Sequence, residues 1–350
     1  MKKLIILILA AVMLLSLVSC DPKTQNDSSA PAAESSGSAE SAEESKEASV
    51  PAEKTDIRVA GLKGPTSIGM VKLMRDAEDG NAANNYEFTV AGSADEVTPK
   101  LIKGEFDIAA IPANLAAVLY NNTDGEIRII AINTLGVLYI VEKGGEVAKL
   151  EDLKGKTIYA TGKGSTPEYT LRHILEKNGI DPDKDVTIDF KSEPSEVVPL
   201  LKKAEKAVAM LPQPYVTVAS ANVEGLNTVI DLNAEWGKVE SDTGIITGVT
   251  VVRKAFADEH PEAVKEFLKE YGASVEYVNA NVEDAAALVE KYGIVAAAVA
   301  KKAIPQCNIT FISGNEMKTP LSVYLGVLYE ANAKSVGGKL PGDDICLVLE

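Results

Sequence analysis

Two short loops in this chain carry the residue types that hydrogen-bond small polar molecules. The first contains Gly64, Pro65, Thr66 and Ser67, and the second contains Gly164, Ser165 and Thr166. Each loop follows a β-like run and precedes a helical run. Helix starts expose free backbone N–H groups, and short hydroxyl side chains add donors. The pair predicts a solute-binding site, with simple capping of each helix by its own Ser or Thr as the alternative.

A second matched pair of positions follows a later β-like run in each half of the chain. Pro112 and Asn114 stand in the first half, and Gln213 and Tyr215 in the second. Asn114 and Gln213 can donate and accept hydrogen bonds to a solute, and Tyr215 can stack on it or close the site. The alternative for each amide is a turn held by its own backbone.

Further candidates lie near these loops. Tyr169 stands one turn into a predicted helix, where a packed core tyrosine is the alternative. Gly136 and Thr247 lie in extended runs, and glycines there let the backbone approach a ligand or flex, although strand bends explain them equally well. Lys163 can attract an anion or simply be solvated. Because no arginine falls in either loop, a bidentate grip on an oxyanion is not assured.

The elements that must position these residues alternate between strand and helix. In the first half β-like runs at 56–61, 86–90, 106–112 and 127–132 alternate with helical runs, and the rhythm restarts at 157–160, 186–190 and 207–211. This predicts an α/β fold of two lobes, each a mostly parallel sheet flanked by helices. Crossing segments are expected at 135–141 and 245–252. Lobe 1 is therefore expected at 56–136 and 248–350, and lobe 2 at 137–247.

The N-terminal segment indicates export. Two lysines precede an apolar run that is too short to span a bilayer as a helix and ends at Leu17-Val18-Ser19-Cys20. Residues 1–20 are therefore expected to be a lipoprotein signal peptide with a lipobox, and Cys20 the lipid-modified residue. Residues 21–55 carry eight acidic residues against three lysines and one large aliphatic residue, which predicts a disordered acidic tether.

Composition limits the partners and cofactors. The net charge is −16, and no basic stripe is present, so nucleic acid is not expected as a partner. Only two histidines and scattered cysteines are present, so no metal site or cofactor is expected. Outside the cell Cys307 and Cys346 are able to form a disulfide; two free buried thiols are the alternative.

The chain resembles the lipoprotein substrate-binding proteins of bacterial ABC importers, in the group for nitrate, sulfonates, taurine and thiamine-precursor pyrimidines. Besides the signal with Cys20 and the Gly64–Pro65–Thr66–Ser67 turn, the resemblance rests on residues 103–113 (KGEFDIAAIPA), 151–158 (EDLKGKTI) and 260–264 (HPEAV). It covers nearly all of residues 56–350.

This resemblance implies the type 2 periplasmic-binding-protein fold, with lobes that close on a small solute and deliver it to a membrane permease. The protein is then expected on the extracytoplasmic face of the cell membrane, lipid-anchored and monomeric. An enzyme of the same fold, such as a dehydratase or a thiamine-pyrimidine synthase, is the alternative. Neither His173 nor His260 lies in a candidate loop, which weighs against catalysis.

Overall fold

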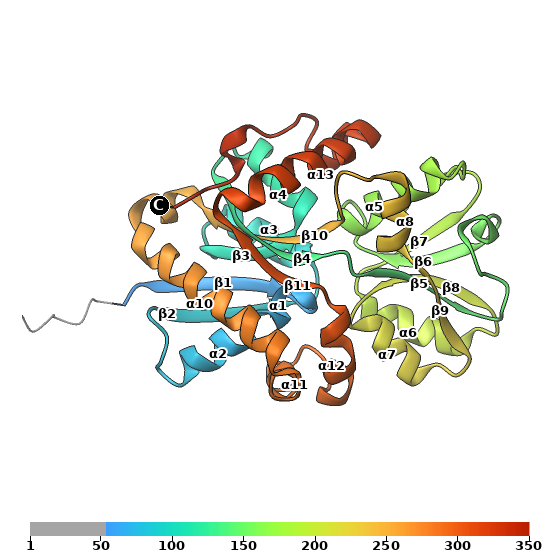
Figure 1. Cartoon of the computed structure of the whole chain (residues 1–350), viewed down its shortest axis with the longest axis horizontal. Helices are drawn as coiled ribbons and strands as arrows, with labels where there is room; N and C mark the ends of the chain where they lie inside the picture. Colours follow the sequence, from blue (N-terminus) through green and yellow to red (C-terminus); the bar gives the residue numbers. More distant parts are fainter. Residues whose placement is uncertain (1–53, 350) are drawn as a thin grey trace, which may run out of the picture. The chain divides into compact units, whose positions relative to one another are not determined.

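The computed structural model describes residues 54–349, which form two β-sheets flanked by helices (Figure 1). The first sheet has the order β11-β4-β10-β3-β1-β2, and the second has the order β7-β6-β8-β5-β9. Strands of the first sheet are β1 (Asp56–Leu62), β2 (Asn85–Ala91), β3 (Ile108–Pro112), β4 (Ile127–Leu135), β10 (Ile246–Arg253) and β11 (Ile309–Ser313). Strands of the second are β5 (Leu138–Lys143), β6 (Thr157–Thr161), β7 (Thr187–Lys191), β8 (Ala207–Pro212) and β9 (Leu226–Asp231).

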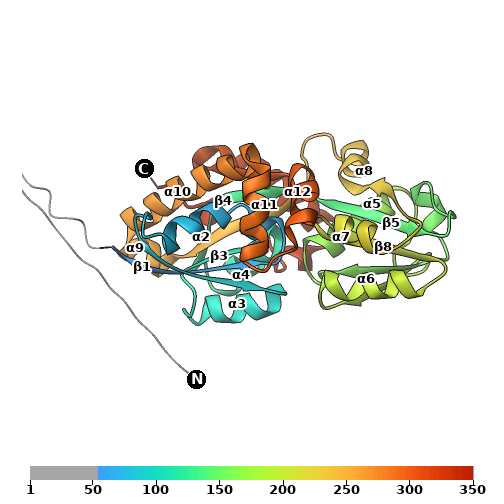
Figure 2. The ribbon, with the colours of Figure 1, turned by 90° about the horizontal axis from the view of Figure 1, so that it is seen from below.

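The helices divide between the two sheets. With the first sheet are α1 (Pro65–Ile68), α2 (Val71–Glu78), α3 (Ala94–Ile102), α4 (Ala113–Asn122), α9 (Lys254–Glu259), α10 (Pro261–Ala280), α11 (Val282–Lys291), α12 (Ala297–Ala303) and α13 (Lys318–Ala331). With the second are α5 (Thr166–Lys177), α6 (Pro194–Lys203), α7 (Tyr215–Asn222) and α8 (Leu232–Val239). Figure 2 shows the two groups side by side, with α3 and α6 on the same side of the molecule. The predicted two-lobed α/β fold is confirmed.

The two sheets repeat one arrangement. β1 pairs in parallel with β2 and β3, and β6 pairs in parallel with β7 and β8. Each sheet also contains one antiparallel strand at which the chain enters from the other lobe. β10 lies between β3 and β4, and β5 lies between β8 and β9. Right-handed βαβ units explain the parallel part. The crossing strands run against it because they enter from the opposite lobe.

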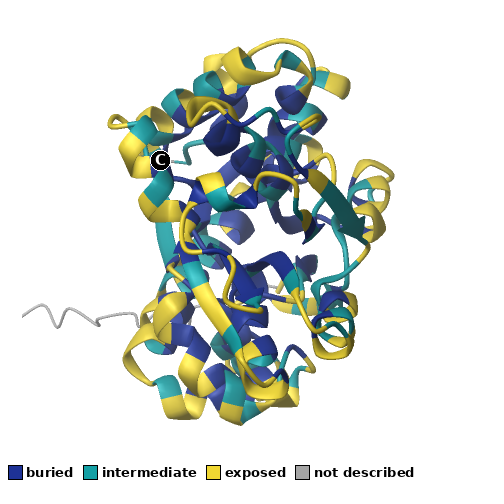
Figure 3. Cartoon of the chain, turned by 90° about the vertical axis from the view of Figure 1, so that its right-hand side faces the viewer, coloured by how far each residue is buried: buried dark blue, intermediate teal, exposed yellow. Residues whose placement is uncertain are grey.

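Burial explains the apolar strands. β3 (IAAIP) and β8 (AVAMLP) are almost wholly buried, as expected for strands covered on both faces. Figure 3 shows buried residues on the strands and inner helix faces, with exposed residues on the outer helices and loops.

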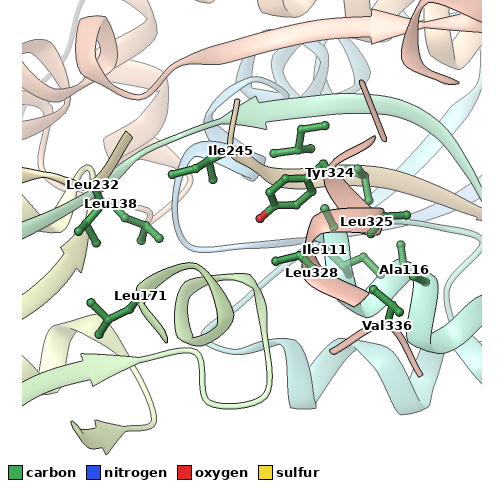
Figure 4. Close-up of a cluster of buried hydrophobic side chains, with 14 of the residues drawn as sticks. Ile111, Ala116, Leu138, Leu171, Leu232, Ile245, Tyr324, Leu325, Leu328 and Val336 are labelled. Carbon is green, nitrogen blue, oxygen red and sulfur yellow. The ribbon is translucent and has the colours of Figure 1, made fainter. Parts of the chain in front are cut away.

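One hydrophobic cluster joins the two lobes. It contains Ile111 in β3, Leu138 and Leu171 in the second lobe, and Tyr324 (Figure 4). Trp236 also belongs to it, and Trp236 and Tyr324 are both fully buried. The rings of Trp236 in α8 and Tyr324 in α13 lie 5.5 Å apart. A core shared in this way makes the two lobes one packed unit along the α5, α8 and α13 side.

A buried carboxylate fixes the base of β3. Asp107 is 2% exposed and accepts hydrogen bonds from Arg58 and Arg253, at 2.8 Å each. Burial acts to raise the pKa of the Asp107 carboxyl, but these hydrogen bonds bring it below its usual value. The cluster ties β1, β3 and β10 together at the end of the sheet where β1 begins.

Of the two alternatives for Cys307 and Cys346, the structure has the pair of buried free thiols and not the disulfide. They pack in different hydrophobic clusters, which separates the two side chains. The signal peptide, Cys20 and nearly all of the predicted tether lie outside the described residues. Within the described part no helix is long and apolar enough to cross a membrane.

Candidate functional site

A cavity of about 560 Å³ lies between the two lobes, and both contribute to its wall. Its lining comes from the turns that join strands to helices. The first lobe supplies the β1–α1, β2–α3 and β3–α4 turns, and the second supplies the β6–α5, β7–α6 and β8–α7 turns. The crossing segments contribute Thr134, Val137, Leu138 and Thr247. Ligands of open α/β sheets bind beyond the carboxyl ends of the strands, and this cavity occupies that place for both sheets.

The β6–α5 turn is shaped by glycine. Gly162 and Gly164 have φ values of +75° and +72°, in the left-handed region that glycine adopts without strain. The Ser165 hydroxyl donates to the Gly162 carbonyl at 2.7 Å, and the Gly164 N–H donates to Glu168 at 2.7 Å. The turn is therefore held in shape by bonds of its own, with Gly164 and Ser165 on the cavity wall.

The opposite wall is the start of α1. Thr66 donates to the Leu62 carbonyl at 3.4 Å, and β10 passes close behind it. A Cβ at Gly248 would lie 2.8 Å from the Thr66 methyl and 2.5 Å from Asn133 Oδ1, so only glycine fits there. Beside it, Thr247 lines the cavity, and its buried hydroxyl has no hydrogen-bond partner within residues 54–349. An unpaired buried hydroxyl at the wall is available to a solute.

Carboxylates already occupy several of the helix-start amides. Glu96 accepts from the N–H groups of Gly92 and Ser93 at 3.1 Å, Glu168 takes that of Gly164, and Glu196 takes that of Ser192 at 3.3 Å. The N–H groups that these carboxylates bind, including that of Gly164 in the predicted β6–α5 loop, are not free for a solute.

The charged side chains on the wall are mainly lysines. Lys63 comes from the first lobe and Lys163 from the second, and neither ammonium has a carboxylate or carbonyl partner in residues 54–349. Lys191 pairs with Asp189 at 2.8 Å, and Asp95 is the acidic residue of the lining. No arginine is among the lining residues of the described chain. A negatively charged group on a solute would therefore be bound by lysine ammonium groups.

The structure brings seven of the predicted site residues to the cavity: Gly64, Pro65, Thr66, Pro112, Gly164, Ser165 and Thr247. Neither helix start shows the alternative, a side-chain cap, since neither α1 nor α5 has a capping hydrogen bond. The remaining seven are not among the lining residues: Ser67, Asn114, Gly136, Thr166, Tyr169, Gln213 and Tyr215.

Packing explains most of these seven positions. Ser67 is fully buried, and a Cβ at Gly61 would lie 2.3 Å from its hydroxyl. Tyr215 is in the hydrophobic cluster under α6 and α7, and Tyr169 packs against the shared core. Burial raises the pKa of both phenols, which are therefore neutral. Gly136 faces Asn233, and its carbonyl accepts from Asn308.

Asn114, Thr166 and Gln213 instead make hydrogen bonds between the lobes. Asn114 Nδ2 donates to the Gly164 carbonyl at 3.2 Å, and the Thr166 hydroxyl donates to Asn114 Oδ1 at 3.1 Å. Gln213 Nε2 donates to Gln306 Oε1 at 2.9 Å. These side chains support the cavity from behind its wall.

Sequence reasoning missed two whole turns of the lining. The β2–α3 turn contributes Gly92, Ser93 and Asp95, and the β7–α6 turn contributes Phe190 and Ser192. Both follow a predicted strand and precede a predicted helix. The signal that selected the other turns would therefore have found them too.

Residues 83–303 match the family described as ABC transporter, phosphonate, periplasmic substrate-binding protein. The chain belongs to this family. It is the solute-binding component of an ABC import system, as the sequence predicted, and the family assignment favours solute binding over the enzyme alternative. A search of curated proteins found no match.

Solved structures support the fold of this substrate-binding protein. An ABC transporter protein from Parabacteroides distasonis is 23% identical with a TM-score of 0.69, over 85% of this chain and 100% of that one. The periplasmic aliphatic sulphonate-binding protein of Escherichia coli is 17% identical with a TM-score of 0.67, over 85% and 94%. The periplasmic nitrate-binding protein of Synechocystis is 15% identical with a TM-score of 0.61, over 84% and 87%.

Proposed function

We propose that this protein captures an organic acid: a solute with one acidic end and an apolar body. The observation that carries the proposal is the composition of the cavity wall, where Lys63 and Lys163 from opposite lobes, without an acidic partner in residues 54–349, accompany a largely apolar lining. One exposed lysine from each lobe on the wall of the same cavity favours an anionic group on the solute.

The size of the cavity supports an apolar body. About 560 Å³ is in the range of sites for organic molecules and far exceeds what a bare oxyanion fills. Its apolar lining includes Leu62, Leu115, Val137, Leu138 and Phe190. Nitrate, which the Synechocystis neighbour binds by name, would leave this surface without a partner. A phosphonate or sulfonate with a substantial organic group would cover it.

The polar part of the lining favours hydrogen-bond acceptors on the solute. Thr247 from the first lobe and Thr161 from the second line the wall with hydroxyl groups that donate to no group within residues 54–349, whereas those of Thr66 and Ser165 already donate to backbone carbonyls. Without an arginine fork the acidic group is held by lysine charge and hydroxyl donors. Such a site tolerates a carboxylate, sulfonate or phosphonate more evenly than a guanidinium site does.

We further propose that the lobes, 56–136 with 248–350 and 137–247, close on the solute and that the closed form docks on the permease. The signal with Cys20 supports a lipid anchor on the extracytoplasmic face, and residues 21–55 a tether between lipid and domain. A single copy carries a complete cavity, which supports a monomer.

A thermal-shift screen tests the solute class. Alkanesulfonates, alkylphosphonates and fatty acids of graded chain length should raise the melting temperature, because they bind the folded chain and not the unfolded one. Affinity should rise about fourfold per methylene, since a buried CH₂ contributes about 0.8 kcal/mol. Nitrate and inorganic phosphate control for charge alone, and alcohols of the same chain length for the apolar body alone.

Two outcomes would contradict the proposal. Equal shifts from alcohols and acids would remove the acidic end from the solute class. If no compound in a wider metabolite panel shifts the melting temperature while one of them is chemically converted, solute capture itself would be refuted.

A further inference from the structure

Asn114 belongs to the first lobe but holds a cavity loop of the second. It is the second residue of α4, two residues after the cavity residue Pro112, and is fully buried. Its Nδ2 donates to the Gly164 carbonyl at 3.2 Å and to the Ser335 carbonyl at 2.9 Å. Its Oδ1 accepts from the Thr166 hydroxyl at 3.1 Å. Both N–H donors of the amide are therefore used within the protein, and two of its three bonds cross between the lobes.

Gln213 makes the reverse connection from the equivalent position of the second lobe. It follows Pro212 at the end of β8, as Asn114 follows Pro112 and Ala113 at the end of β3. Gln213 is 1% exposed, and its Nε2 donates to Gln306 Oε1 in the first lobe at 2.9 Å. Its Oε1 accepts from the Thr217 hydroxyl at 2.9 Å, which orients the amide. Each lobe thus has one buried side-chain amide, just after β3 or β8, that hydrogen-bonds to the other lobe.

We propose that Asn114 and Gln213 are reciprocal clasps that hold the lobes together before solute binds. They are positioning residues for capture: they set the balance between open and closed lobes, and Asn114 fixes the Gly162–Ser165 turn against the cavity. The proposal uses the lobe closure proposed above but not the solute class, so it is tested without any solute.

The energetics favour an equilibrium that these amides control. Opening the lobes would expose each amide to water, which replaces the lost partners, so one clasp changes the equilibrium only by the net value of its hydrogen bonds. Losing one net hydrogen bond raises the ratio of open to closed molecules about fivefold. The Gln306 side chain makes one interlobe bond, so removing it should raise this ratio about fivefold. The Asn114 side chain makes two, so removing it should raise the ratio about 25-fold.

The experiment measures the distance across the cleft in the full chain without solute. Spin labels attached through Lys103→Cys at the end of α3 and Lys203→Cys at the end of α6 report opening by electron–electron double resonance; both positions are exposed. Cys20→Ser removes the thiol at the anchor position, and Cys307 and Cys346 are buried. The parent protein should give mainly one short distance, and Asn114→Ala and Gln306→Ala should each add a longer one.

Asn121→Ala is the matched control. Asn121 lies on the same helix, and its Nδ2 donates to the Val336 and Lys339 carbonyls at 2.7 Å, all within the first lobe. It should lower stability and leave the distance unchanged. Should Asn114→Ala fail to fold, Gln306→Ala at an exposed position still decides the matter. A parent protein that is already open, unchanged distances in a folded Gln306→Ala variant, or an equal shift in Asn121→Ala would overturn the proposal.

Discussion

Tyr324 in α13 joins the cores of the two lobes, and replacing it by alanine should destabilise the whole body. The ring is fully buried and lies 5.5 Å from that of Trp236 in the second lobe. Its hydroxyl approaches the Thr170 hydroxyl at 3.4 Å, the long end of a hydrogen bond.

The magnitude follows from what is removed. A buried aromatic ring truncated to alanine costs about 3–5 kcal/mol through lost transfer energy and the remaining cavity. The contact between the Tyr324 and Trp236 rings contributes about 0.5–1.5 kcal/mol of stability beyond that from buried area alone. We therefore expect Tyr324→Ala to lower the free energy of unfolding by about 4 kcal/mol. Tyr324→Phe removes only the weak hydroxyl contact and should cost less than about 1 kcal/mol.

Urea unfolding gives the measurement, followed by far-UV circular dichroism and by fluorescence. Trp236 is the single tryptophan of the chain and sits in the shared core, so its emission reports that core directly. Because one cluster spans both lobes, the two signals should change in one transition. A loss below about 1 kcal/mol for Tyr324→Ala, or separate transitions of the two signals in the parent protein, would refute a shared core.

Three further predictions concern charge and thiols. Ionised Asp107 should stabilise the protein fully above about pH 4 and lose that effect as the pH falls further, because its pKa is lowered by folding. Asp107→Asn should lower the free energy of unfolding by roughly 2–3 kcal/mol at pH 7, less than for a fully buried ion pair because the arginines are partly exposed. Urea titrations should show that this loss shrinks in acid, and a loss that stays constant with pH would contradict the prediction. Lys63→Gln and Lys163→Gln should each weaken an acidic solute about threefold to tenfold by calorimetry while barely changing stability; unchanged affinity would remove the lysines from the site. Burial raises the pKa of Cys307 to about 12 and of Cys346 to about 11, so a thiol reagent at pH 8 should modify them only in urea, and fast labelling of the folded chain would be inconsistent with their burial.

The parts of the fold that were predictable share one property: their signal is local. β3 and β8 are apolar runs that end at proline, and the turns after β1 and β6 combine glycine with hydroxyl residues before a helix. Each pattern is complete within a few residues. The first lobe, the second lobe and their repeated order could therefore be inferred without contacts.

Other elements had no comparable local signal. β9 (LNTVID) is largely exposed or half-buried, and α8 follows it directly, so neither shows a clear alternation. β11 is a five-residue strand in a helical segment and pairs with β4, more than 170 residues earlier in the chain. The pairing of Cys307 with Cys346 was equally open, because the sequence does not say which hydrophobic cluster each thiol joins.

By itself the sequence determined that the chain has two βαβ halves and that small polar turns follow their strands. Tertiary structure decided which side chains of those turns reach the cavity. Asn114 and Gln213 looked like solute ligands because an amide can bond any polar group nearby. Their interlobe partners, Gly164 and Gln306, are 50 and 93 residues away, and only the packing of one lobe on the other brings them within hydrogen-bond distance.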